Sequence, residues 1–270
     1  MNYLNCKDRV LPGDMKLAAA FFSGLSAEHA ELLLESGKLA APFYQETENA
    51  RDRFSELKQS YSSPETAARP DALLNQNRKF IELLEKMKFE ACGQPLFRQK
   101  VFHIICEQRY INTAFGTRQN ACGMISVAFR PLQSFPLTCL CNQMYFWGGS
   151  AAEHPEQLLC HEDFKSIING KTAERLLRIS RCFTELCFET AAVNPPLRTA
   201  AVTELFIRFN QANNEFLGFL LHAKSGSPAV YSRSPAGMLP RAFYSELRHI
   251  TSEHRHIKTL CETAEGFLKI

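Results

Sequence analysis

The sequence predicts a mostly α-helical globular protein, a bundle of several helices, and three observations support this prediction. Apolar residues recur three and four positions apart through most of the chain, which is the spacing of one face of an α-helix. Clusters of proline, glycine and serine interrupt the pattern at intervals that suit separate helices. The 270 residues are 45% hydrophobic and include 21 Phe, so a large core can form without disulfide or metal crosslinks.

The first half of the chain predicts an N-terminal helical subdomain over residues 1–128. Its first helical segments follow Met15, with Ser26 as the expected N-cap and Gly37 as the expected stop of one helix. A further helix begins at Leu96. Between them we expect two helices, each with a stripe of mostly apolar or small residues at helical spacing. After Pro42 the stripe is Phe43, Thr47, Ala50, Phe54, Leu57 and Tyr61, and after Pro70 it is Leu73, Asn77, Phe80, Leu84 and Met87.

Residues 129–155 predict an irregular connection rich in aromatic residues and cysteine, because prolines and paired glycines interrupt this stretch. A C-terminal helical subdomain over 156–270 then follows, although one single domain over 1–270 also fits the length. We identify no internal repeat in the sequence.

The helices of the second half are expected over about 155–168, 172–192, 197–222 and 241–268. The stretch around "KSGSP" leaves an alternative open, because it also suits the turn of a small β-hairpin near 215–234.

Composition narrows the classes of partner and compartment. The formal net charge of +3 is spread along the chain, so nucleic-acid binding is possible but is not indicated by the charge. The ten cysteines fall mostly inside apolar helical stripes, which favours buried thiols in a reducing, cytoplasmic setting. No apolar stretch approaches the roughly 20 residues that a membrane-spanning helix needs.

The segment "GTRQNACGMISVAFRP" suggests a thiol nucleophile at Cys122. A cysteine at a helix N-terminus is activated when its pKa falls, and Gln119 is placed to donate a hydrogen bond to an oxyanion. Asn120-Ala121-Cys122-Gly123 resembles the nucleophile segment of ubiquitin C-terminal hydrolases and related thiol proteases. The resemblance implies a thiol hydrolase or transferase, with His222 as the first choice of base. The alternative is that Cys122 is a small buried residue of a helical core.

The last helix contains "SELRHITSEHRHIK", which suggests a second chemistry. Arg248 followed by His254 resembles the Arg-x4–6-His motif of HEPN-type ribonucleases. The resemblance implies metal-independent RNA cleavage, in which the arginine stabilises charge on the phosphate and the histidine moves the proton. His254 also falls on the apolar stripe of this helix, so a hydrogen-bonded core histidine is the alternative.

The same helix spaces Glu246 from His249, and Glu253 from His256, as the Glu-x-x-His pairs of di-iron carboxylate bundles are spaced. Helical periodicity turns these histidines away from the apolar stripe, so we expect a solvated face and no metal there. The minority option for a metal is zinc held by the residues of the irregular connection and its end, Cys139, Cys141, Cys160 and His161.

No phosphate-binding loop, dinucleotide fingerprint or zinc-protease motif is present, so we expect no cofactor. The function that the sequence favours is binding of a protein partner through helix grooves and the aromatic segment around Trp147. The thiol hydrolase and the ribonuclease are the two enzyme alternatives, and whether the protein is an enzyme stays open.

Overall fold

A computed structural model of the chain describes residues 12–65, 70–116, 137–193, 199–232, 234–235 and 238–268. The chain divides into two compact units, unit 1 over Met1–Arg130 and unit 2 over Pro131–Ile270. The long elements of both units are helices, which confirms the mostly α prediction.

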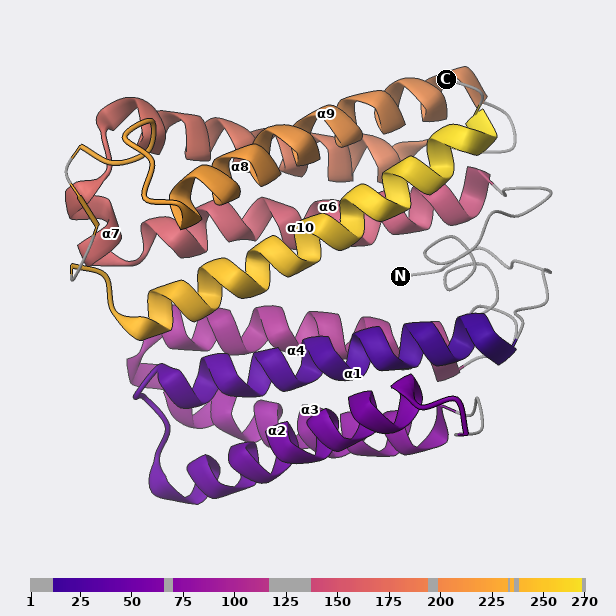
Figure 1. Cartoon of the computed structure of the whole chain (residues 1–270), viewed down its shortest axis with the longest axis vertical. Coiled ribbons are helices and arrows are strands. Elements are labelled where there is room, and N and C mark those ends of the chain that lie inside the picture. The colour runs from indigo at the N-terminus through magenta and orange to yellow at the C-terminus, as the bar shows by residue number, and fades with distance from the viewer. Residues whose placement is uncertain are drawn as a thin grey trace. The chain divides into compact units, whose positions relative to one another are not determined.

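Unit 1 is an up-and-down bundle of four long helices (Figure 1), α1 (Pro12–Glu35), α2 (Ala41–Ser62), α3 (Asp71–Glu90) and α4 (Pro95–Gly116). A short 3-10 helix, η1 (Ala91–Gly93), joins the last two. Each helix packs against the next, and α4 also contacts α1, so the four helices surround one core.

Local sequence explains where these helices begin and end. The predicted stripes of α2 and α3 are buried as expected. Gly37 follows α1 with a φ of +65°, a left-handed conformation that glycine adopts at no steric cost, so its role as a stop is confirmed. Ser26 is not an N-cap, because α1 begins fourteen residues earlier, and its hydroxyl donates instead to the carbonyl oxygen of Phe22 at 2.9 Å.

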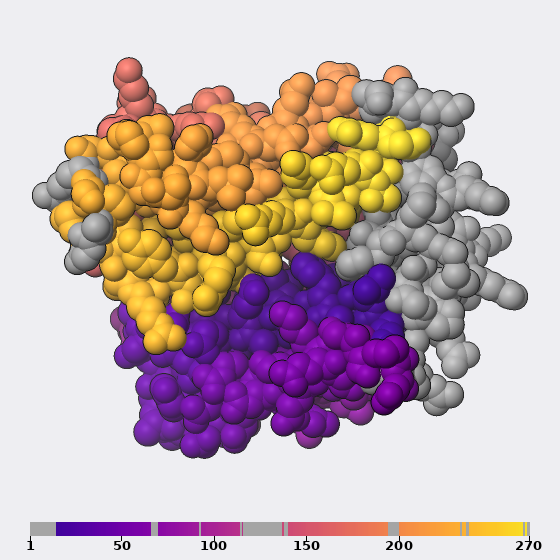
Figure 2. Space-filling model, in the orientation of Figure 1, coloured from indigo at the N-terminus to yellow at the C-terminus, as the bar shows by residue number. Residues whose placement is uncertain are grey.

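Unit 2 repeats this plan (Figure 1) with α6 (Leu137–Leu159), α8 (Gly170–Ala192), α9 (Thr199–Lys224) and α10 (Arg241–Leu268). A short helix, α7 (Glu162–Ile167), lies between α6 and α8. Contacts between successive long helices, and between α10 and α6, close the second bundle. Figure 2 shows the side chains of α10 (yellow) lying against those of α9 (orange) on the surface of this unit.

Two expectations for the second half differ from the structure. Most of the expected irregular connection over 129–155 is helix α6, because its aromatic residues and glycines pack inside the bundle. Trp147 is buried, and Gly148 lies against Phe209 of α9, close enough for an added Cβ atom to be in van der Waals contact with the ring. The hairpin near 215–234 is not seen, since α9 continues to Lys224, and the described residues there form only an isolated bridge between Ile168 and Tyr231.

Within the described part of the chain, no helix combines the length and the apolar character needed to cross a membrane.

Candidate metal-binding triads

Unit 1 holds a buried group of two histidines and one carboxylate, Triad 1, formed by His29 of α1 and by His103 and Glu107 of α4. One carboxylate oxygen of Glu107 lies 2.7 Å from Nε2 of His29, and the other lies 3.3 Å from Nε2 of His103. The exposed fraction of each side chain is 6% or less. Because His103 and Glu107 are four residues apart, they lie on one face of α4, turned toward α1.

The charge state of Glu107 suits a metal ligand. Burial by itself raises the pKa of this carboxyl group, but charge attraction and hydrogen bonds from His103 and His29 outweigh it. The pKa of Glu107 therefore lies well below its usual range, and the carboxylate is ionised. Metal ligands must be deprotonated, and Glu107 meets that requirement before any ion binds.

Unit 2 holds the same group, Triad 2, formed by His154 of α6 and by His249 and Glu253 of α10. The two oxygens of Glu253 lie 3.0 Å from Nε2 of His154 and 3.3 Å from Nε2 of His249. The exposed fractions of these three side chains are 5% or less. Each unit therefore brings two imidazoles to one carboxylate, with one histidine and the glutamate again four residues apart on the last helix.

The spacing of these atoms fits metal coordination. Nitrogen and oxygen ligands that lie about 2.1 Å from an ion, at right angles to one another, are about 3 Å apart. The four histidine-to-carboxylate distances, from 2.7 to 3.3 Å, match that separation. Two histidines with one carboxylate form the ligand set of non-haem iron sites, in which further coordination positions stay open. Among the described residues, the groups of His, Cys, Asp or Glu that lie close enough to hold a metal ion are drawn from these six side chains alone.

A second layer of polar side chains surrounds Triad 1. The side-chain amide of Gln108 lies 2.7 Å from Nδ1 of His29, on the side of the ring away from Glu107. The backbone of Gln108 is itself held by α3, because Nδ2 of Asn77 donates to its carbonyl oxygen at 2.7 Å. The ring of His29 is thus contacted at both nitrogens, which fixes its orientation.

The same layer recurs around Triad 2 with one change of residue. Nε2 of His254 lies 3.0 Å from Nδ1 of His154. Asn213 of α9 donates from Nδ2 to the carbonyl oxygen of His254 at 3.1 Å, and its Oδ1 lies 2.7 Å from Nδ1 of the same residue. In both units, an asparagine on the third long helix therefore holds the residue that contacts the ligand histidine. Asn77 holds Gln108, and Asn213 holds His254.

The sequence contains a signal for these residues, and the expectation of no internal repeat was wrong. Residues 21–34 and 146–159 are identical at eight of fourteen positions and share Ala-Glu-His-x-Glu-x-Leu-Leu. Residues 103–111 and 249–257 share His-Ile-x-x-Glu-x-Arg-x-Ile. The two matches are offset by different numbers of residues, because the intervening segments differ in length, so a search for one fixed period misses them.

The expected solvated face on the last helix was also wrong. The acidic and histidine residues in question are buried, namely Glu246, His249, Glu253 and His256. The residues of each Glu-x-x-His pair do not contact each other through that spacing. Glu253 instead pairs with His249, which lies one helical turn earlier on α10, and Glu246 lies 2.8 Å from Nε2 of His161. The ring of His256 packs against Trp147 with 5.2 Å between ring centroids.

The residues of the thiol hypothesis are only partly described. Cys122 and Gln119 lie outside the described residues, so their roles stay predictions. His222, the expected base, is exposed near the end of α9. Binding of a protein partner likewise stays a prediction.

The two residues of the ribonuclease hypothesis lie on different faces of α10. Arg248 is exposed, whereas the side chain of His254 is fully buried between α6, α9 and α10 and contacts Asn213 and His154. The alternative, a hydrogen-bonded core histidine, describes the position of His254.

The zinc option is not supported by the positions of its ligands. Cys141 is buried near the start of α6, and Cys160 is exposed just after the end of that helix, so the helical rise separates them by about 28 Å. His161 is instead paired with Glu246. The side chain of Cys139 is not described.

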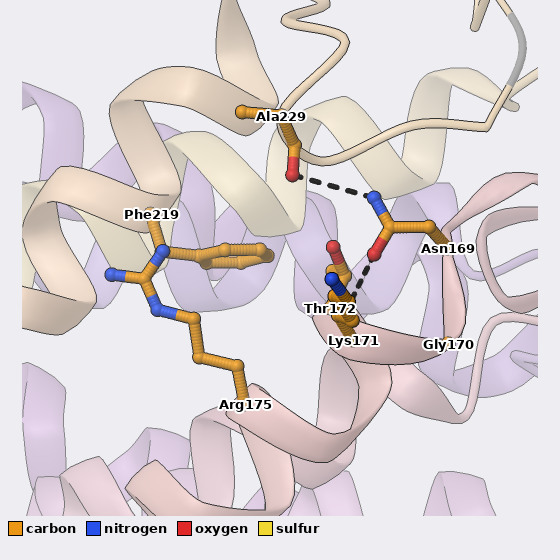
Figure 3. Close-up of a pocket in the computed structure, with 7 residues that line it drawn as sticks. All are labelled: Asn169, Gly170, Lys171, Thr172, Arg175, Phe219 and Ala229. Carbon is orange, nitrogen blue, oxygen red and sulfur yellow. Dashed lines mark hydrogen bonds between the residues drawn. The ribbon is translucent and has the colours of Figure 1, made fainter.

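A surface pocket of about 400 Å³ lies in unit 2 at the start of α8 (Figure 3). Asn169 caps this helix, since its side-chain oxygen accepts a hydrogen bond from the backbone N–H of Thr172 at 2.8 Å. Arg175, which also lines the pocket, donates to Glu215 at 3.0 Å. Two of the pocket's polar side chains are therefore engaged in the fold, Asn169 in capping α8 and Arg175 in joining α8 to α9.

No protein-family model, no curated protein and no solved structure matches this chain, so the two triads are interpreted from their own chemistry.

Proposed function

We propose that this protein is a non-haem metalloprotein in which Triad 1 and Triad 2 bind divalent first-row transition metal ions, with Fe(II) as the best fit. The observation that carries the proposal is the duplication. Both units place the same three ligand types on corresponding helices, and the histidine-to-carboxylate separations are 2.7 and 3.3 Å in unit 1 and 3.0 and 3.3 Å in unit 2.

The energetics of the side chains support binding of a cation. Removing two carboxylates and four histidines from water is costly unless each charge is compensated. A bound divalent ion compensates the carboxylate and uses the lone pairs of the imidazoles together. Mixed imidazole and carboxylate ligands suit Fe, Mn and Zn, whereas Mg²⁺ and Ca²⁺ favour sites made of oxygen alone.

Burial limits the chemistry that such ions can perform. The triad side chains are nearly inaccessible to solvent, so a large substrate does not reach them directly. Small molecules such as dioxygen or peroxide are the reaction partners that fit. Fe(II) held by these residues would supply one electron to dioxygen and become Fe(III), and four such electrons with four protons would reduce one O₂ to two waters.

The test is the metal content of the purified full chain, measured by mass spectrometry after incubation with Fe(II) under anaerobic conditions and desalting. We expect about two ions per chain in the wild type and at least half of the metal lost in Glu107→Gln or Glu253→Gln. The exposed His222→Ala is the matched control and should retain the wild-type content. Wild-type protein that binds no more iron than the Glu107→Gln/Glu253→Gln double variant would disprove the proposal.

A second measurement on the same samples tests the reaction. Iron-loaded wild type should consume dissolved dioxygen, as followed with an oxygen electrode, at one O₂ for every four Fe(II) oxidised. The double variant should consume it no faster than free Fe(II) at the same concentration.

A further inference from the structure

Gln108 and His254 occupy corresponding positions, each one residue after the triad glutamate, and each contacts Nδ1 of the ligand histidine on another helix. We propose that these two residues are equivalent positioning residues, which accept the Nδ1–H of His29 and His154 and thereby hold Nε2 of each beside its carboxylate, where it can bind a metal ion. The expected effect on metal affinity rests on the proposed function. The position of the proton on each ligand histidine is inferred from the hydrogen bonds alone.

The chain of hydrogen bonds in unit 2 determines where the protons lie. The amide nitrogen of Asn213 donates to the backbone carbonyl of His254, so its amide oxygen is the atom that meets Nδ1 of His254 at 2.7 Å. An oxygen can only accept, so Nδ1 of His254 carries a proton. The ring of His254 is fully buried, and the contacts described for it are with Asn213, His154 and the rings of Phe183 and Phe216, none of which is a carboxylate, so the neutral ring is the form that fits this site.

A neutral ring with a proton on Nδ1 has a lone pair on Nε2. That lone pair faces Nδ1 of His154 at 3.0 Å, so Nδ1 of His154 must donate. The Nε2 atom of His154 then faces Glu253 at 3.0 Å with the geometry of a metal ligand. Histidines that bind metals commonly donate their other N–H in this way, which fixes the tautomer of the ring.

In unit 1 the amide group of Gln108 takes the part of Nε2 of His254. Turning this amide by 180° brings its oxygen, in place of its nitrogen, to the position 2.7 Å from Nδ1 of His29. The Ser26 hydroxyl has a single hydrogen but lies 2.9 Å from the carbonyl oxygen of Phe22 and 3.0 Å from the Gln108 amide. When the Gln108 amide presents its NH₂ group to Ser26 and its oxygen to His29, Ser26 donates to Phe22 and every group has a partner. The oxygen and nitrogen of an amide are assigned from such networks.

The experiment compares two variants of His254 in the full chain. His254→Gln keeps an acceptor and copies the residue of unit 1, whereas His254→Leu removes the acceptor at a similar volume. Isothermal titration with Zn(II), which is redox-inert, should show wild-type affinity within about threefold for His254→Gln. It should show a 10- to 100-fold loss at one of the two sites for His254→Leu, as for other residues behind a metal ligand. Gln108→Leu should produce the same loss.

Equal affinity of His254→Leu and wild type would overturn the proposal, whereas absence of Zn(II) binding by the wild type would overturn the proposed function. The metal-free protein supplies the readout that separates the two. In ¹⁵N-histidine NMR spectra of the wild type, assigned with single histidine variants, Nδ1 of His29 and His154 should carry a proton. An unprotonated Nδ1 in either ring would disprove the positioning role, even if His254→Leu does not fold.

Discussion

Units 1 and 2 build one arrangement from two different sets of neighbours. The ligands are the same, and Asn77 and Asn213 make the same hydrogen bond to the last helix. The residue that contacts Nδ1 of the ligand histidine differs. Gln108 also contacts the hydroxyl of Ser26, whereas His254 contacts Asn213 and the ring of Phe216, with 4.6 Å between ring centroids. The comparison teaches that the triad requires a hydrogen-bond acceptor at this position and accepts more than one side chain that supplies it.

The largest expected effect comes from a fully buried phenylalanine on the second long helix of each unit, Phe54 on α2 and Phe183 on α8. Replacing either by Ala should cost about 3–5 kcal/mol of unfolding free energy, because a large cavity remains. The Phe183 ring lies 5.9 Å from that of His254, whereas Phe54 packs on Phe80. Phe183→Ala should therefore also weaken metal binding in unit 2.

Urea denaturation gives the stability of both variants, and Zn(II) titration gives their affinities. A stability loss below about 1 kcal/mol in either variant would contradict the packing that the structure shows. Equal metal affinity in the two would show that the surroundings of His254 do not matter to Triad 2.

A smaller effect is expected where Tyr110 of unit 1 corresponds to His256 of unit 2. Burial lowers the pKa of His256 to about 4. Between pH 6.5 and 4, the unfolded chain binds one proton at His256 that the folded chain does not bind. The contribution of His256 to stability is therefore complete above pH 6.5 and is lost as the pH falls toward 4. The wild type should lose up to about 3 kcal/mol of unfolding free energy through His256 as the pH falls from 6.5 to 4. His256→Tyr, which introduces the residue found at Tyr110 in unit 1, should not show this part of the loss.

Thermal unfolding followed by circular dichroism at a series of pH values measures this contribution. Tyr110→Phe is the matched control, and its pH dependence should equal that of the wild type. If His256→Tyr follows the wild-type curve at every pH, His256 is not buried in its neutral form.

The smallest effect is expected at the surface, where an arginine joins two helices in each unit. Arg208 forms two hydrogen bonds to Glu189, at 2.6 and 2.8 Å, and Arg51 forms one to Glu31, at 3.1 Å. Arg208→Ala should cost about 0.2–1 kcal/mol, and Arg51→Ala no more than that, because water screens exposed ion pairs. Urea denaturation at 0.05 and 1 M NaCl checks both, and a cost that does not fall in high salt would rule out an electrostatic origin.

The sequence by itself determined the helical class and most helix positions. The stripe of α2 and the glycine after α1 act within a few residues of the chain, so local periodicity and backbone conformation suffice to predict them. The segment 137–155 was mispredicted for a physical reason. Its glycines and aromatic residues indicate a loop when only the sequence is considered. In the folded unit, α8 and α9 supply the surface against which Gly148 packs, and α10 supplies His256, against which Trp147 packs.

Only the tertiary structure decided which polar residues form a site. His29 and His154 carry no metal-site spacing of their own, because their partners lie on helices that return to them only after 74 or more residues of chain. On α10, periodicity placed His249 on the polar side of the helix, which is solvated in an isolated helix. Folding buries that side, so a pattern that predicts water contact in the sequence becomes a buried pair of His249 and Glu253 in the protein.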